Sequence, residues 1–270
     1  MNRLLSLHHL TALDVPATEL VSLAASAGCD AVCLFTYLAG SYAGRFPCID
    51  SMQEVKAVRS RLQETGITVC DLEVFGITPD FDAAAMRPGL ERGAILGATR
   101  ATVHIRDTEE QRAAANFAEF CAMAAQFGII VGLEFTGFSA TRTIDAAARM
   151  VAISGARNGG IAADILHVFR NGMSVEDVAI HSPMVTYAQI CDGKLPANDQ
   201  SYYEEAVADR EIPGRGDFPL VDFIAALPDD IPIAVEVPLH RLRDTGVSAA
   251  ERVKMAVQGA KRVISAASAE

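Results

Sequence analysis

The chain has 270 residues, 50% of them hydrophobic, and its 23 basic and 34 acidic residues give a formal net charge of −11. This acidic balance argues against nucleic acid as a general partner, because phosphate binding requires a basic surface. No apolar run approaches the roughly 18 residues that cross a bilayer, and the N-terminus lacks the features of a signal peptide. We therefore expect a soluble, cytoplasmic protein that binds neither nucleic acid nor membranes.

Short apolar runs recur along the chain and predict eight β-strands. In chain order they cover residues 4–10, 31–36, 67–75, 99–105, 129–136, 160–167, 184–192 and 231–238. The segments between them have helical spacing. In residues 108–127, for example, Ala113, Phe117 and Phe120 fall on one face, opposite the charged Glu109 and Glu119.

Glycines and cysteines agree with this pattern. Four glycines follow predicted helices, as a left-handed helix C-cap requires: Gly28, Gly66, Gly97 and Gly128. The six cysteines are scattered without a C-x-x-C pair, and several lie in apolar runs, so we expect reduced core thiols.

Alternating strands and helices predict an α/β fold, a (β/α)8 TIM barrel in which residues 1–270 form a single domain. A doubly wound open sheet is the competing arrangement. That fold usually carries a G-x-G-x-x-G phosphate loop after its first strand, and the segment "LSLHHLTALD" contains no glycine.

Polar residues end four successive predicted strands in the second half of the chain. Glu134 ends the run at 129–136, Asp164 and His167 end 160–167, Gln189 lies near the end of 184–192, and Glu236 near that of 231–238. Barrel enzymes build their active sites at these strand ends. Each residue alone could instead cap a helix, bond a loop or form an ion pair.

Together these residues predict a metal site. Three converging carboxylates would repel one another without a cation, and oxygen ligands suit a hard divalent ion. We expect one divalent ion per chain, Mn²⁺, Mg²⁺ or Co²⁺, with Glu134, Asp164, Gln189 and Glu236 as its ligands. Gln189 would be the neutral ligand.

At this point the sequence resembles the xylose isomerase-like, metal-dependent TIM barrels, often called sugar phosphate isomerase/epimerase-like, over most of its length. In that family a Glu, an Asp-x-x-His, a His or Gln, and a Glu end four successive strands, as Glu134, "DILH", Gln189 and Glu236 do here. The family also tends to carry an Arg shortly before a Pro-Gly-x-Gly segment, which matches Arg210 in "REIPGRG". Sugar epimerases of this group usually have His where Gln189 stands, whereas bacterial 3-dehydroshikimate dehydratases can have Gln.

The resemblance implies a metal-dependent isomerase or epimerase of carbohydrate metabolism. Its substrate would be a small polyhydroxylated carbonyl compound: a sugar, a sugar phosphate or a keto-cyclitol. A divalent ion chelated by the carbonyl and its neighbouring hydroxyl stabilises the enediolate formed by proton abstraction. Glu134 and Glu236 are the candidate acid/base pair, and His167 should point toward a substrate oxygen. Loss of a β-hydroxyl instead would make the protein a dehydratase, a lyase of the 3-dehydroshikimate dehydratase type.

Two further functions are open. A metal-dependent endonuclease acting on abasic DNA shares this barrel, but six histidines and a charge of −11 do not favour a multi-zinc, basic-faced enzyme. A barrel without catalysis, used for binding or assembly, is the other alternative. A homodimer is the common default for such proteins.

Other polar residues are candidates for the substrate pocket, with surface or core positions as the alternative: His8, His9, Glu73 and His104. Lys194 and Arg210 lie in a connection of about 25 residues that precedes a helix predicted near Phe218. A loop of that length is usually functional. We expect Arg210 to bind a substrate carboxylate or phosphate and to touch no metal ligand, with a solvated loop position as the alternative.

Overall fold

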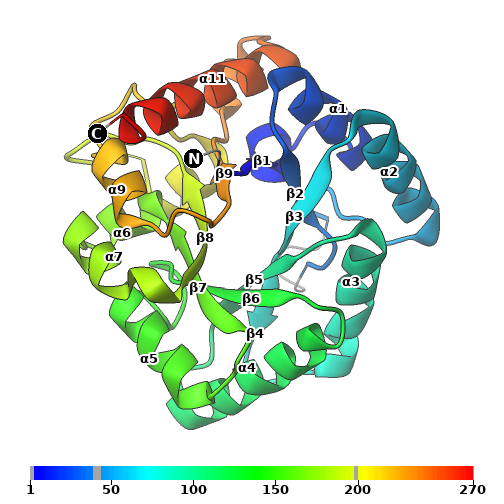
Figure 1. The fold of residues 1–270 in the computed structure, drawn as a ribbon, viewed down its shortest axis with the longest axis vertical. Helices are drawn as coiled ribbons and strands as arrows, with labels where there is room; N and C mark the ends of the chain where they lie inside the picture. The colour runs from blue at the N-terminus through cyan, green and yellow to red at the C-terminus, as the bar shows by residue number, and fades with distance from the viewer. Residues whose placement is uncertain (1–2, 39–43, 198–199, 270) are drawn as a thin grey trace.

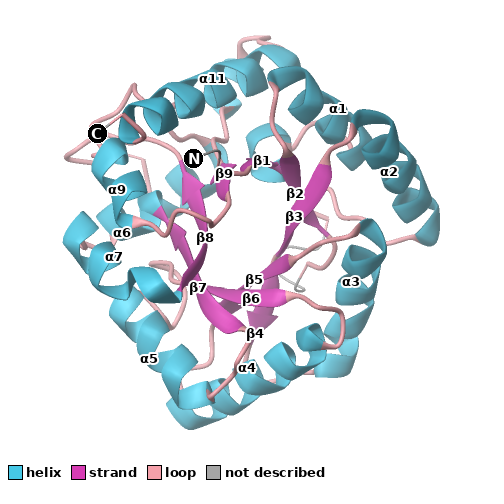
Figure 2. Cartoon of the chain, viewed as in Figure 1, coloured by secondary structure: helices cyan, strands magenta, loops and turns pink. Residues whose placement is uncertain are grey.

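The computed structural model describes residues 3–38, 44–197 and 200–269. An inner ring of strands is surrounded by helices (Figures 1 and 2). All strand pairs are parallel. The strands are β1 (Leu5–His8), β2 (Ala31–Phe35), β3 (Thr68–Glu73), β4 (Phe75–Ile77), β5 (Arg100–Ile105), β6 (Ile130–Glu134), β7 (Gly159–Asp164), β8 (Val185–Ile190) and β9 (Ile233–Val235).

The order of the strands in the sheet closes the barrel. It runs β3-β2-β1-β9-β8-β7-β6-β5-β4, and its two edge strands, β3 and β4, are separated in the chain only by Val74. The predicted strand at 67–75 is therefore two strands. β3 pairs with β2 and β4 pairs with β5, so the chain changes neighbour at this point. Counting β3 and β4 as one broken strand confirms the predicted eight-stranded (β/α)8 barrel.

Helices surround the strands (Figures 1 and 2). They are α1 (Ala17–Ala27), α2 (Met52–Thr65), α3 (Ala83–Leu96), α4 (Glu110–Ala125), α5 (Ile144–Ser154), α6 (Ile165–Arg170), α7 (Val175–His181), α8 (Tyr202–Ala208), α9 (Leu220–Ala226), α10 (His240–Asp244) and α11 (Ala249–Ala267), with short 3-10 helices η1 (His9–Ala12) and η2 (Ser182–Met184). In the described part of the chain, none of the helices is long and apolar enough to cross a membrane.

Helix α4 confirms the helix and the apolar face predicted for residues 108–127. The predicted apolar face is buried against the barrel, including Phe117 and Phe120. Glu109 caps the helix by accepting hydrogen bonds from the amides of Gln111 and Arg112. The predicted glycine caps are confirmed for α1, α2 and α3. Helix α4 ends at Ala125 with Gln126 as its C-cap, and Gly128, which has the predicted left-handed conformation, follows two residues after that cap.

All six cysteines are free thiols, as predicted. Five are buried, and Cys48 is half-buried.

Candidate active site

The carboxyl ends of the strands surround a cavity of about 60 Å³. Its apolar lining is Leu10, Phe35, Phe46, Val74, Phe138, Ala206 and Val207, and its polar lining is Glu73, His104, Glu134, His167, Arg210 and Glu236. The wall is thus largely apolar, with charged groups gathered at the strand ends. Such an arrangement is typical of a small-molecule site.

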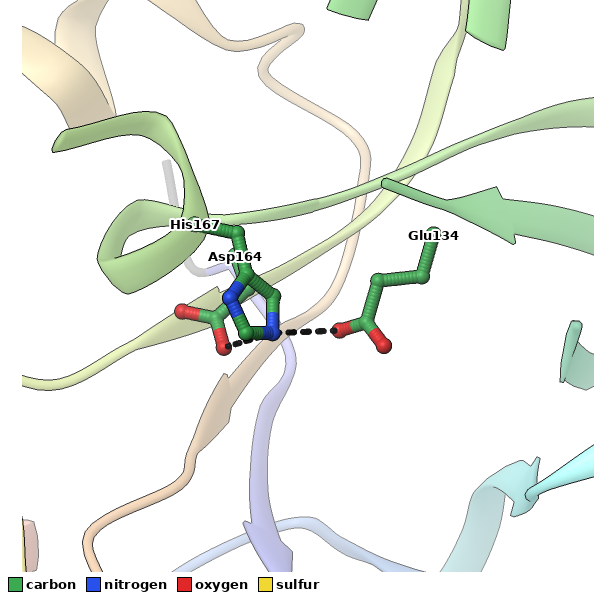
Figure 3. Close-up of side chains that lie close together, drawn as sticks. All are labelled: Glu134, Asp164 and His167. Carbon is green, nitrogen blue, oxygen red and sulfur yellow. Dashed lines mark ion pairs between the residues drawn. The ribbon is translucent and has the colours of Figure 1, made fainter. Parts of the chain in front are cut away.

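Glu134, Asp164 and His167 form a group that could hold a metal ion (Figure 3). One ligand atom from each residue lies within 4.8 Å of those of the other two, and all three side chains are buried. His167 Nε2 is 3.7 Å from Oδ2 of Asp164 and 4.0 Å from Oε1 of Glu134. The sequence placed two of these residues among the metal ligands and assigned His167 to the substrate.

Asp164 is held in place by the start of α6. Its Oδ1 accepts a hydrogen bond of 2.9 Å from the amide of Leu166, and this caps the helix. Oδ2, the other carboxylate oxygen, accepts a 2.8 Å hydrogen bond from Nη1 of Arg210. The predicted strand at 160–167 therefore ends at Asp164, and His167 lies on the following helix, one turn further along. The side chain of Asp164 therefore caps α6 and also belongs to the group that could hold a metal ion.

Arg210 lies among the buried carboxylates at the strand ends, in a cluster with Asp164 and Glu236, rather than in solvent. Its guanidinium is 2% exposed and forms ion pairs of 2.8 Å with Asp164 and 3.0 Å with Glu236. The expectation that Arg210 touches no predicted metal ligand is therefore wrong. Its backbone amide donates a hydrogen bond to the carbonyl of Pro238, and its Nε donates one to the carbonyl of Ala206 in α8. These bonds fix the backbone and the side chain of Arg210.

Gln189 and Glu236 contribute unpaired oxygens at the same level. Nε2 of Gln189 donates a 2.9 Å hydrogen bond to Oε1 of Glu73. Oε1 of Gln189 and Oε2 of Glu236 are buried and have no hydrogen-bond partner among the described residues. Buried acceptors of this kind are rare unless a water or an ion is present. These two oxygens could therefore serve as ligands of a metal ion, because no protein group donates a hydrogen bond to them in the described part of the chain.

The carboxyl groups of Glu134 and Glu236 differ in their electrostatic surroundings. Burial by itself would raise the pKa of Glu134, but the charge and hydrogen bond of His104 outweigh it and lower the pKa to about 2. Burial raises the pKa of Glu236 to about 8, although Arg210 acts in the opposite direction. The surroundings therefore shift the pKa values of the two carboxyl groups in opposite directions, that of Glu134 downward and that of Glu236 upward. Pairs with separated pKa values are typical of acid/base sites.

Helix α8 brings in a residue that the sequence analysis missed. The connection after β8 is not a simple loop, because it contains α8, and Tyr202 at its start contacts Nδ1 of His167. The capping box formed by Ser201 and Glu204 was the available sequence signal. Lys194 from the same connection stays outside the cluster. Its ammonium bonds the carbonyl of Arg215 at the surface.

The two histidines at the end of β1, His8 in the strand and His9 at the start of η1, point in different directions. His8 Nε2 lies 2.8 Å from Oε2 of Glu73. His9 is buried away from the cavity, with Nε2 3.0 Å from the carbonyl oxygen of Val15 and its ring stacked on Phe35. The structure therefore places His9 in the core.

A pH effect on stability should follow from the position of His9. Burial lowers the pKa of His9 to about 4, although the Val15 carbonyl acts in the opposite direction. Below about pH 6.5 the unfolded chain takes up a proton that the folded state rejects, so stability falls from there toward pH 4. In His9→Gln, the free energy of unfolding should fall less steeply over this range, as urea titrations would show. Parallel pH profiles for the two proteins would contradict this assignment.

Comparisons with known proteins agree with this geometry. The family model for the xylose isomerase-like TIM barrel matches residues 21–263. A structure of IolI protein with a bound zinc atom is 18% identical, with a TM-score of 0.79 over 97% of this chain and 98% of that one. D-allulose 3-epimerase from Methylomonas sp. in complex with D-allulose is 17% identical, with a TM-score of 0.71 over 97% and 98%.

A third structure, D-psicose 3-epimerase from Clostridium cellulolyticum H10 with D-tagatose, is 13% identical and has a TM-score of 0.72 over 97% of this chain and 98% of that one. A search of the curated proteins found no match. At these identities the solved structures establish a common fold. The match of the family model over most of the chain shows that this protein belongs to the xylose isomerase-like TIM barrel family.

Proposed function

We propose that the protein is a metal-dependent isomerase or epimerase that acts on a small polyhydroxylated carbonyl compound. The observation that carries this proposal is the buried group of Glu134, Asp164 and His167 at the mouth of the barrel, with Glu236 nearby across Arg210. The epimerase structures with D-allulose and D-tagatose, which share the fold, support this substrate class.

The residues present fit a hard divalent ion. Four carboxylates are buried at the strand ends, those of Glu73, Glu134, Asp164 and Glu236, and Arg210 is the one buried guanidinium that pairs with any of them in the described part of the chain. The unpaired oxygens of Gln189 and Glu236 are ligands that Mn²⁺ and Mg²⁺ prefer. Glu134, Asp164, Gln189 and Glu236 would hold the ion, with His167 as a further donor beside it.

The reaction would divide between two faces of the substrate. A divalent ion held by these residues would polarise the substrate carbonyl and its neighbouring hydroxyl and would so acidify the adjacent C–H bond. One of Glu134 and Glu236 takes that proton. The other returns a proton on the opposite face, and this inverts the configuration at that carbon. His167, whose ring is fixed by Tyr202, faces a substrate oxygen. The apolar walls, including Phe46 and Phe138, exclude water around the reacting carbon.

Gln189 is the residue that favours a second candidate reaction, dehydration. Its amide makes the proposed ligand set all-oxygen, as can occur in the 3-dehydroshikimate dehydratases that the sequence resembles. In that reaction a β-hydroxyl leaves after proton abstraction, and no proton returns to carbon. A dehydratase would use the same metal ligands and the same base.

Proton exchange distinguishes the two reactions. In deuterated water, a panel of ketoses and keto-cyclitols should include a substrate that takes up deuterium α to its carbonyl without losing water. Nuclear magnetic resonance of the recovered sugar gives the position of the label. Conversion of 3-dehydroshikimate into a catechol acid, seen by its ultraviolet absorbance, would overturn the isomerase in favour of the dehydratase.

A further inference from the structure

Glu73, at the end of β3, has no role in the chemistry proposed above, although it lies against one of the proposed metal ligands. Its side chain is buried, and both of its carboxylate oxygens face nitrogen atoms. Oε1 accepts the 2.9 Å hydrogen bond from Nε2 of Gln189, and Oε2 lies 2.8 Å from Nε2 of His8. Glu73 therefore accepts a hydrogen bond from Gln189 on one side and lies beside the ring of His8 on the other, where Nε2 of His8 has no hydrogen-bond partner among the described residues.

The backbone of η1 decides which nitrogen of His8 carries the proton. The amide of Leu10 donates a 3.0 Å hydrogen bond to Nδ1 of His8. A ring nitrogen that accepts a hydrogen bond carries no proton, so the proton of this imidazole is on Nε2, toward Glu73. The N–H of His8 is therefore on the side of Glu73, close to its carboxylate but without a hydrogen bond to it.

The carboxylate of Glu73 determines how the amide of Gln189 is turned. A side-chain amide offers N–H groups on one side and an oxygen on the other. Since Nε2 of Gln189 faces Glu73, its Oε1 faces away, and that oxygen is buried with no hydrogen-bond partner in the described part of the chain. The reversed amide would set an oxygen against the carboxylate of Glu73, so two acceptors would meet.

We propose that Glu73 is a positioning residue that orients the Gln189 amide so that its oxygen binds the divalent cation. This inference rests on the metal site of the proposed function and extends it to a residue outside the ligand set. Partners of metal ligands commonly fix ligand orientation, and their replacement costs about 10- to 100-fold in metal affinity. Glu73 acts on the cation through Gln189.

A double-mutant cycle on Mn²⁺ affinity tests the proposal without any substrate. Glu73→Gln leaves one acceptor oxygen at position 73. Because the nearby N–H of His8 favours that oxygen on its own side, the introduced amide should present its N–H groups to Gln189 and turn the oxygen of Gln189 away from the cation. We expect about 10- to 100-fold weaker Mn²⁺ binding, measured from the electron paramagnetic resonance signal of free Mn²⁺. In the Gln189→Ala background the same substitution should cost less than about threefold, because no amide remains to be oriented.

The cycle separates orientation from charge. Loss of a negative charge near the cation would weaken binding equally in both backgrounds, and an equal loss would overturn the proposal. No loss from Glu73→Gln would overturn it too. Thermal unfolding in chelator checks that each variant folds.

The charge-conserving double variant E73Q/Q189E is a second test that does not depend on the stability of Glu73→Gln alone. It reverses the hydrogen bond and leaves a carboxylate oxygen toward the cation, so Mn²⁺ affinity should stay within about tenfold of wild type. A loss of about 100-fold or more would overturn the proposal. Wild-type protein that binds no Mn²⁺ would overturn this proposal and the metal-dependent function together, whereas a failed substrate panel would affect only the reaction.

Discussion

Removal of divalent ions should reduce turnover by at least about 1000-fold, and Mn²⁺ or Mg²⁺ should restore it. The expected size follows from the several kcal/mol of charge stabilisation that a metal ion supplies to the transition state of such a reaction. Elemental analysis of the purified protein should find about one ion per chain. Turnover is measured after exhaustive dialysis against a chelator, on a substrate identified by deuterium exchange. Activity that survives complete chelation would end the metal hypothesis.

Substitution of the proposed carboxylate ligands should also reduce turnover, because the protein would no longer hold the metal ion. Glu134→Gln and Asp164→Asn preserve side-chain volume but each remove one negative charge from the proposed ligand set. Both should lose metal as well as turnover, by more than the about 10- to 100-fold that changes beside a ligand cost. Glu119→Gln is the matched control, because Glu119 lies on the exposed face of α4. Variants that keep full metal content would show that these oxygens are not ligands.

Arg210→Ala should destabilise the metal-free protein by about 3–5 kcal/mol, because Asp164 and Glu236 would remain buried without their guanidinium partner. A divalent ion supplies positive charge to the same carboxylates. Mn²⁺ should therefore raise the Tm of the variant more than it raises that of the wild type. The measurement is thermal unfolding of both proteins in chelator and in Mn²⁺.

The control for this result is Arg149→Ala, which breaks an exposed ion pair with Glu110 and should cost only about 0–1 kcal/mol. An Arg210→Ala protein that unfolds like wild type in chelator would contradict the importance of the buried pairs. If Arg210 also binds an anionic group of the substrate, as the sequence predicts, the metal-loaded variant should show a KM raised about 10- to 100-fold.

Local patterns predicted most of the fold, because they depend on neighbours in the chain. Apolar runs located the barrel strands, and the apolar face of residues 108–127 located α4. The strand at 67–75 was the exception, since its division into β3 and β4 depends on a change of partner from β2 to β5. Periodicity carries no information on which strand lies alongside. Helix α8 was missed although Ser201 and Glu204 form a local capping signal.

The sequence by itself determined that Glu134, Asp164, Gln189 and Glu236 stand at the carboxyl ends of successive strands of a parallel barrel, because strand ends can be read from the chain and barrel closure brings them to one level. Only the tertiary structure decided which groups these side chains meet. Arg210 pairs with Asp164, 46 residues away, and with Glu236, 26 residues away. Gln189 bonds Glu73 across 116 residues. Contacts over such distances arise where separate segments pack together, and the direction of each buried side chain follows from the partners that this packing supplies.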